Sequence, residues 1–149
     1  MAKDVTSVLN DLIETSRDGE QGFRTAAEHA KDANLKTVFA TRAEDCARAI
    51  SELQAAVVQL GGHAETKGSV SGALHRGWTE LKAAVTSDKD QALLDECERG
   101  EDVAKKRYRD ALDEELPADV RALIERQYQG VVNNHDRIRD LRNQFAASK

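Results

Sequence analysis

The chain has 149 residues, a formal net charge of −5 and only 4% aromatic residues. This length suits one domain with a continuous core, so we expect a single domain over residues 1–149. One proline and abundant Ala, Leu, Glu, Lys and Arg predict an all-α fold. Acidic residues interrupt the basic clusters at 105–107 and 137–142, which excludes the continuous basic face of a nucleic-acid-binding protein.

The chain shows no targeting or membrane segment. Its first residues lack the apolar run of a signal peptide, and no stretch approaches the ~20 apolar residues of a membrane span. We therefore expect a cytoplasmic protein without membrane contact. In that reducing compartment Cys46 and Cys97, which lack a Cys-x-x-Cys spacing, are expected to be buried, slowly reacting thiols.

The first predicted helical hairpin covers residues 4–61. Its first helix is expected over about 4–31, with apolar or small residues at Leu12, Ser16, Gly19, Phe23, Ala26 and Ala30. The next helix, which Asn34 is expected to cap, carries Phe39, Ala43, Cys46, Ile50, Leu53, Val57 and Leu60 on one face. It is predicted to end at Gly61-Gly62, and the short turn between the two helices makes them antiparallel neighbours.

A crossover over residues 62–87 follows. Glycines interrupt its first half, and a short amphipathic helix near 72–85 is predicted, anchored by Trp78. A connection of this length can travel the whole length of a bundle.

The second predicted hairpin covers residues 88–146. We expect Ser87 to cap its first helix and Pro117 to begin its last helix. That last helix carries Val120, Ile124, Gln127, Val131, Asn134, Ile138 and Leu141 along one face. Two hairpins joined by a long crossover predict a ferritin-like four-helix bundle. A shift of 81 residues superimposes the two hairpins in register with seven identities, which indicates a duplicated hairpin.

Two glutamate pairs occupy equivalent places in this repeat: Glu20 with Glu44, and Glu101 with Glu125. Each glutamate lies roughly 18 Å along its helix from the hairpin turn, at a rise of about 1.5 Å per residue. A full-length crossover puts the two turns at opposite ends, so both pairs lie near the middle of the bundle. Facing inward, four carboxylates would suit a site for two iron or two manganese ions.

The same glutamates fit a second interpretation. A bundle metal site of this kind also needs Glu-x-x-His on two helices, and Ala47 and Tyr128 stand where those histidines would be. Three of the glutamates precede a basic residue by four positions, the usual pattern of an exposed ion pair: Glu20-Arg24, Glu44-Arg48 and Glu101-Lys105.

The sequence predicts structural roles for three further polar side chains. Gln127 and Asn134 are predicted to form core hydrogen bonds that hold the helix register. His135 is predicted to be an ordinary, partly exposed histidine.

Several sequence blocks resemble a known family: VLNDLIE at 8–14, DGEQGF at 18–23, GALHRGW at 72–78, ECERGED at 96–102 and RQYQG at 126–130. Together they are similar to an uncharacterised bacterial family described as ferritin-like four-helix-bundle proteins (domain of unknown function 2383). The resemblance implies a ferritin-like fold and a cytoplasmic bacterial protein. It implies no established activity or cofactor.

Two functional hypotheses follow. The first is a non-catalytic helical bundle, with a stress-associated role, that acts through association with itself or with another protein. The second is a divergent carboxylate-bridged protein that binds or oxidises iron, or binds manganese, at Glu20, Glu44, Glu101 and Glu125. Metal content after purification separates the two.

Overall fold

The computed structural model describes residues 4–63 and 78–147, and every regular element in those ranges is a helix. The helices are α1 (Val5–His29), α2 (Ala33–Gln59), the short α4 (Leu81–Thr86), α5 (Asp90–Leu112) and α6 (Ala118–Ala147). The predicted all-α class is therefore confirmed. Much of the helix predicted near 72–85 lies outside the described residues, and α4 covers its last part.

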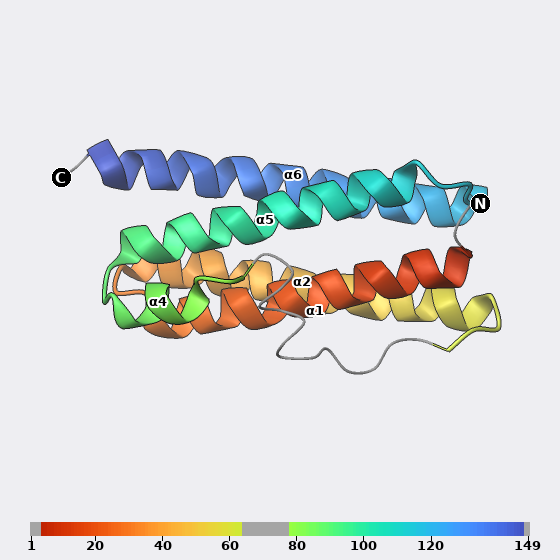
Figure 1. Ribbon diagram of the computed structural model, residues 1–149, viewed down its shortest axis with the longest axis horizontal. Coiled ribbons are helices and arrows are strands. Elements are labelled where there is room, and N and C mark those ends of the chain that lie inside the picture. The colour runs from red at the N-terminus through yellow and green to blue at the C-terminus, as the bar shows by residue number, and fades with distance from the viewer. Residues whose placement is uncertain (1–3, 64–77, 148–149) are drawn as a thin grey trace.

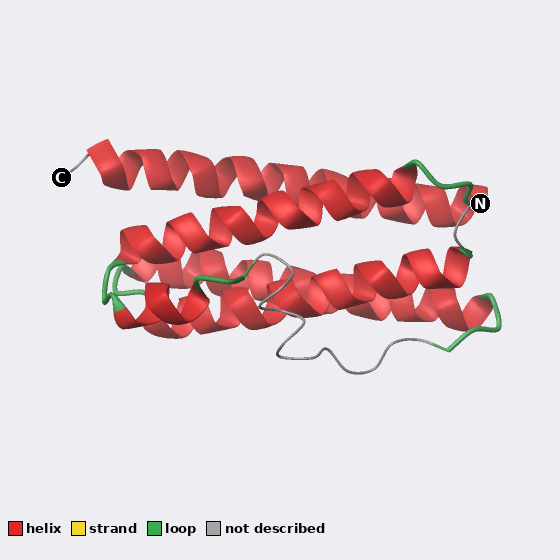
Figure 2. Cartoon of the chain, viewed as in Figure 1, coloured by secondary structure: helices red, strands yellow, loops and turns green. Residues whose placement is uncertain are grey.

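The four long helices form two packed hairpins, α1 with α2 and α5 with α6 (Figure 1). The α1–α2 turn and the α5–α6 turn lie at opposite ends of the molecule, as Figure 1 shows. The hairpins pack on one another mainly through α1 and α5, whereas α2 and α6 barely touch. In Figure 2, α4 lies close to the α1–α2 turn; it packs mainly on α5 and to a smaller extent on α1.

Local capping explains where the helices begin and end. Asp32, rather than the predicted Asn34, caps α2, because its carboxylate accepts a hydrogen bond from the backbone N–H of Leu35 at 3.1 Å. Gly61 follows α2 with a φ of +77°, a left-handed conformation that glycine adopts without strain. The carbonyl of Pro117 accepts a hydrogen bond from the Arg121 N–H at 2.9 Å, so that Pro117 directly precedes α6.

The predicted cap of α5 is wrong. Lys89 precedes the helix without a side-chain cap, and Ser87 instead accepts a hydrogen bond from the Lys89 N–H at 3.3 Å. Asp90 reaches across to the α1–α2 turn, where its carboxylate accepts hydrogen bonds from the N–H groups of Lys31 at 2.8 Å and Asp32 at 2.9 Å. These bonds tie the beginning of the second hairpin to the turn of the first.

Trp78 anchors the end of the crossover, as predicted. Its ring lies against Gly22 of α1 and Gly100 of α5, where a Cβ atom on either glycine would approach the ring to about 2.5 Å or less. The ring also packs edge-on against Phe23, with the two centroids 5.3 Å apart. The two glycines therefore provide the space into which the indole inserts between the hairpins.

The core consists of two apolar clusters. One surrounds the α1–α2 turn and includes Phe23, Leu35, Phe39, Trp78 and Leu94. The other lies toward the α5–α6 turn and includes Leu9, Ile13, Leu53, Tyr108 and Ile124. None of the helices within the described ranges has both the length and the apolar character needed to cross a membrane.

Candidate functional site: a polar layer between the hairpins

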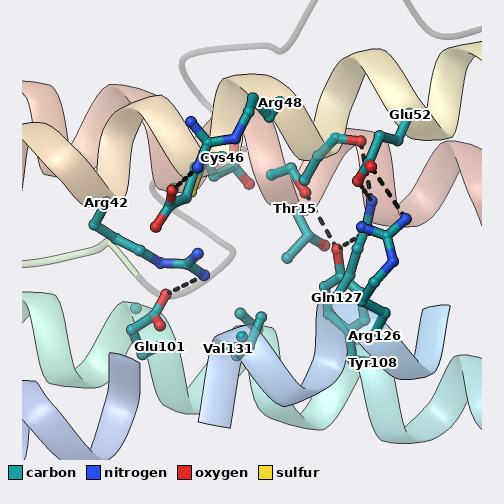
Figure 3. A pocket seen from close by; sticks show the side chains of 18 of the residues that line it. Thr15, Arg42, Cys46, Arg48, Glu52, Glu101, Tyr108, Arg126, Gln127 and Val131 are labelled. Carbon is teal, nitrogen blue, oxygen red and sulfur yellow. Dashed lines mark hydrogen bonds and ion pairs between the residues drawn. The ribbon is translucent and has the colours of Figure 1, made fainter. Parts of the chain in front are cut away.

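A cavity of about 190 Å³ lies between the two hairpins, where residues of both apolar clusters and polar side chains meet. All four long helices contribute to its lining, together with Trp78. Figure 3 shows the polar groups gathered there, with Arg42 and Glu101 on one side of Val131 and Tyr108 and Gln127 on the other. The middle of the molecule is thus polar, while both ends of the core are apolar.

An ion pair links the hairpins at this level. The Nη2 atom of Arg42 on α2 donates to Oε1 of Glu101 on α5 at 3.3 Å (Figure 3). The other carboxylate oxygen of Glu101 accepts a hydrogen bond from Nδ2 of Asn134 on α6 at 3.2 Å. Glu101 is 2% exposed and Arg42 is 8% exposed. Each charge therefore depends on its partner, because burying an unpaired charge is costly.

A second set of hydrogen bonds lies on the other side of the cavity. The Tyr108 hydroxyl donates to Oε1 of Gln127 at 2.8 Å and lies 3.5 Å from the Ser16 hydroxyl. Nε2 of Gln127 donates to the Ala49 carbonyl at 3.3 Å and to Oε1 of Glu52 at 3.0 Å. Gln127 and Asn134 thus form core hydrogen bonds, as predicted.

Two ion pairs stand at the α2–α6 side of the cavity. Arg126 of α6 lies 3.0 Å from Glu52 of α2, and Arg48 pairs with Asp45 along α2. Their arginine side chains are more than half exposed. These pairs therefore mark the solvent-facing edge of the cavity, at the place where α2 and α6 separate.

Burial suppresses ionisation of the two cysteine thiols and of the Tyr108 hydroxyl. It raises the pKa of the Cys46 thiol to about 11 and raises the pKa of Cys97 well above its usual range. It also raises the pKa of the Tyr108 hydroxyl. Both cysteines are free and buried, as predicted, and neither has the low pKa of a reactive thiol.

The four glutamates of the predicted metal site differ in their exposure to solvent. Glu101 is buried, Glu20 is partly exposed, and Glu44 and Glu125 are exposed. Glu20 pairs with Arg24 at 2.9 Å, as its spacing predicted. Among the described residues, no three His, Cys, Asp or Glu side chains are grouped in a way that could hold a metal ion. Metal binding by these glutamates stays a prediction.

Two of the ion pairs expected on exposed helix faces have other partners in the structure. Glu101 has its ion pair with Arg42 across the hairpins rather than along α5, and Arg48 pairs with Asp45, three residues before it. The buried Glu101 thus pairs with an arginine of the facing hairpin.

The comparison with protein families gives a match. The sequence model of a family described as a domain of unknown function (DUF2383) matches residues 4–114, about three quarters of the chain. The chain belongs to this family. The search of curated proteins gave no match.

The match to the DUF2383 family covers only part of the polar layer. Arg42, Glu101 and Tyr108 lie inside the matched region, and Gln127 and Asn134 on α6 lie beyond it. The ion pair that joins the hairpins therefore lies entirely within the part of the chain that matches the family model.

Sequence reasoning missed Arg42. This residue follows Phe39 by three positions and precedes Cys46 by four, so it lies on the same helical stripe as two buried residues. That spacing indicates a buried position. The predicted apolar face of this helix instead runs through the neighbouring Ala43, which is also buried.

The prediction that His135 is partly exposed is wrong, because it is buried at 7% exposure. Its Nε2 lies 2.7 Å from Oδ1 of Asp102 and 3.8 Å from Oε2 of Glu98 on α5, and its Nδ1 lies 3.2 Å from Asp136. The hydrogen bond with His135 lowers the pKa of Asp136. His135 lies four residues after Val131 and three before Ile138, so the core stripe of α6 includes it.

Proposed function

We propose that this protein is a non-catalytic helical bundle of the ferritin-like type, which acts through association with itself or with another protein. Two long hairpins with turns at opposite ends support the ferritin-like arrangement. In this proposal residues 1–149 form one cytoplasmic domain, and the role is stress-associated.

One observation carries the proposal: the buried carboxylate of Glu101 already has a cation of the protein as its partner. Carboxylate-bridged metal proteins place several acidic side chains at mid-bundle, where the metal ions neutralise them. Here Glu101 is fully buried, and the guanidinium of Arg42 lies 3.3 Å from it. A divalent ion at this place would meet an arginine, whose positive charge repels it. The ion pair thus favours a structural layer over a redox centre.

The alternative is a divergent protein with two iron or two manganese ions held by Glu20, Glu44, Glu101 and Glu125. It rests on the equivalent heights of the four glutamates in the repeat, and it requires Glu44 and Glu125 to turn inward from exposed positions. The proposal and this alternative make opposite predictions about the purified protein.

Metal analysis of protein expressed in medium supplemented with iron and manganese separates the two functions. The proposal predicts far less than one ion per chain and no shift of the melting temperature with Mn(II). Near-stoichiometric metal that disappears in the Glu20→Gln/Glu101→Gln double variant would establish the alternative, because ligand binding stabilises the folded state by mass action. A Glu14→Gln/Glu115→Gln variant is the matched control for loss of two negative charges elsewhere.

Association is tested separately by sedimentation equilibrium over a range of protein concentrations. Self-association predicts a mass that rises above the 16.4 kDa of one chain as concentration increases. A constant monomer mass would restrict the proposal to association with a different protein, which cross-linking in cells would then have to capture.

A further inference from the structure

The size of the cavity between the hairpins suits a ligand. At about 190 Å³ it exceeds an engineered apolar cavity of roughly 150 Å³ that binds benzene. The space lies between the two hairpins and is partly open to solvent, so a small molecule can reach it without unfolding of the helices. Its solvent-facing edge at Glu52 and Arg126 offers a way in between α2 and α6.

Arg42 has a buried donor that no acceptor of the described residues satisfies. Its guanidinium extends from α2 into the space between the hairpins, as Figure 3 shows. Within residues 4–63 and 78–147, Nη2 of Arg42 donates to Glu101, and the buried Nε–H has no partner. A guanidinium has five N–H donors, and a buried donor without an acceptor destabilises the folded protein. An occupant that offers an acceptor oxygen to this guanidinium would remove part of that cost.

The charges around the cavity disfavour an ionic occupant. The lining has three arginines and four acidic residues: Arg42, Arg48, Arg126, Asp18, Asp45, Glu52 and Glu101. All three arginines already pair with carboxylates of this same lining. A ligand carboxylate would therefore compete with Glu101 for Arg42, and a cationic ligand would face the arginine.

The remaining lining favours a partly apolar body. Trp78, Ala104 and Val131 contribute apolar surface, and all three are buried. The hydroxyl groups of Ser16 and Tyr108 add two polar positions at the other side of the cavity.

We propose that this cavity binds a small, uncharged molecule with a ring-sized body and a hydrogen-bond-accepting carbonyl oxygen. Arg42 donates to the oxygen, and the ring lies against Trp78, Ala104 and Val131. The chemical class is that of simple aromatic amides and ketones. This binding goes beyond the proposed function, because it does not depend on whether or how the protein associates.

Benzamide is the probe, with benzoate and toluene as its charged and apolar counterparts. Protein-detected NMR titration of the full chain follows the indole N–H of Trp78, the single tryptophan. We expect saturable binding of benzamide that shifts this signal. Benzoate should bind at least tenfold more weakly, because its charge competes with Glu101. No binding of benzamide, or tighter binding of benzoate, would overturn the proposal.

Three variants locate the site. Ala49→Phe fills the cavity from its half-exposed edge and should abolish binding of benzamide and toluene. Ala40→Phe, an exposed position on the same helix outside the lining, is the matched control and should leave binding unchanged. The Arg42→Met/Glu101→Gln double variant removes the donor without leaving a lone charge, so it should weaken benzamide at least tenfold and spare toluene. Benzamide binding that survives Ala49→Phe would place the ligand elsewhere and contradict the proposal.

Discussion

A methyl group added at Gly100 tests the insertion of Trp78 between the hairpins. An ideal Cβ at this position would lie 2.4 Å from Cε2 and Cζ2 of Trp78, far inside the contact distance of two carbon atoms. Gly130 on α6 is the matched control, because a Cβ there meets nothing within 4 Å. Both glycines lie inside helices, so the same substitution carries the same change in helix propensity.

The two effects have opposite signs. Replacing a helical glycine by alanine gains up to about 1 kcal/mol. Overpacking a filled interior costs typically about 1–3 kcal/mol, and a rigid indole has little freedom to yield. We therefore expect Gly100→Ala to lower the free energy of unfolding by roughly 1–2 kcal/mol and Gly130→Ala to raise it by up to about 1 kcal/mol.

Urea unfolding followed by circular dichroism measures both variants, and tryptophan fluorescence reports Trp78 directly because the chain has one tryptophan. Gly100→Ala should also shift the emission of the native protein to longer wavelength as the ring is displaced. In a Trp78→Ala background the clash is absent, so the same change should become favourable. If Gly100→Ala stabilises the parent as much as Gly130→Ala does, the indole does not occupy this space.

Three further predictions concern charged and thiol groups. Glu20→Gln should cost only a few tenths of a kcal/mol in urea unfolding, because its pair with Arg24 is a partly exposed i, i+4 pair, and a loss above 1 kcal/mol would show that Glu20 has an interior role. Burial raises the pKa of Glu96, so the folded state binds the carboxyl proton more tightly than the unfolded state does. The free energy of unfolding should therefore fall as pH rises from about 4.5 through the raised pKa. Glu96→Gln should flatten this part of the stability profile, and an unchanged profile would show that Glu96 does not cause it. Cys46 and Cys97 should react with a thiol reagent far more slowly than in urea, and rapid native labelling of both would contradict their burial.

The helices could be predicted from the sequence because their signals are local. The 3–4 spacing of apolar residues sets each helix, and Gly61 and Pro117 mark two of the boundaries. The opposite placement of the two turns followed from the length of the crossover. Caps were less predictable: Asp90 acts on a turn almost sixty residues earlier in the chain, and no local pattern reports such a contact.

The polar layer could not be predicted because the rotation of each helix decides it. Glu20 and Glu101 occupy equivalent places in the repeat, and each directly follows a glycine of the predicted seam, yet Glu101 is buried and Glu20 is partly exposed. Gly100 offers no side chain and lies against Trp78, and Glu101 beside it turns toward Arg42 and Asn134. The duplicated sequence therefore does not imply a symmetrical interior.

A double-mutant cycle on Arg42 and Glu101 tests the central claim most directly, namely that Arg42 neutralises the buried carboxylate of Glu101 between the hairpins. Urea unfolding of Arg42→Met, Glu101→Gln and the double variant, with EDTA present, gives the coupling free energy. We predict that each single change costs about 3 kcal/mol, because it leaves one buried charge unpaired, and that the double variant costs less than the two single losses added together. Single losses that simply add would show that the two side chains do not pair, and the account would fail.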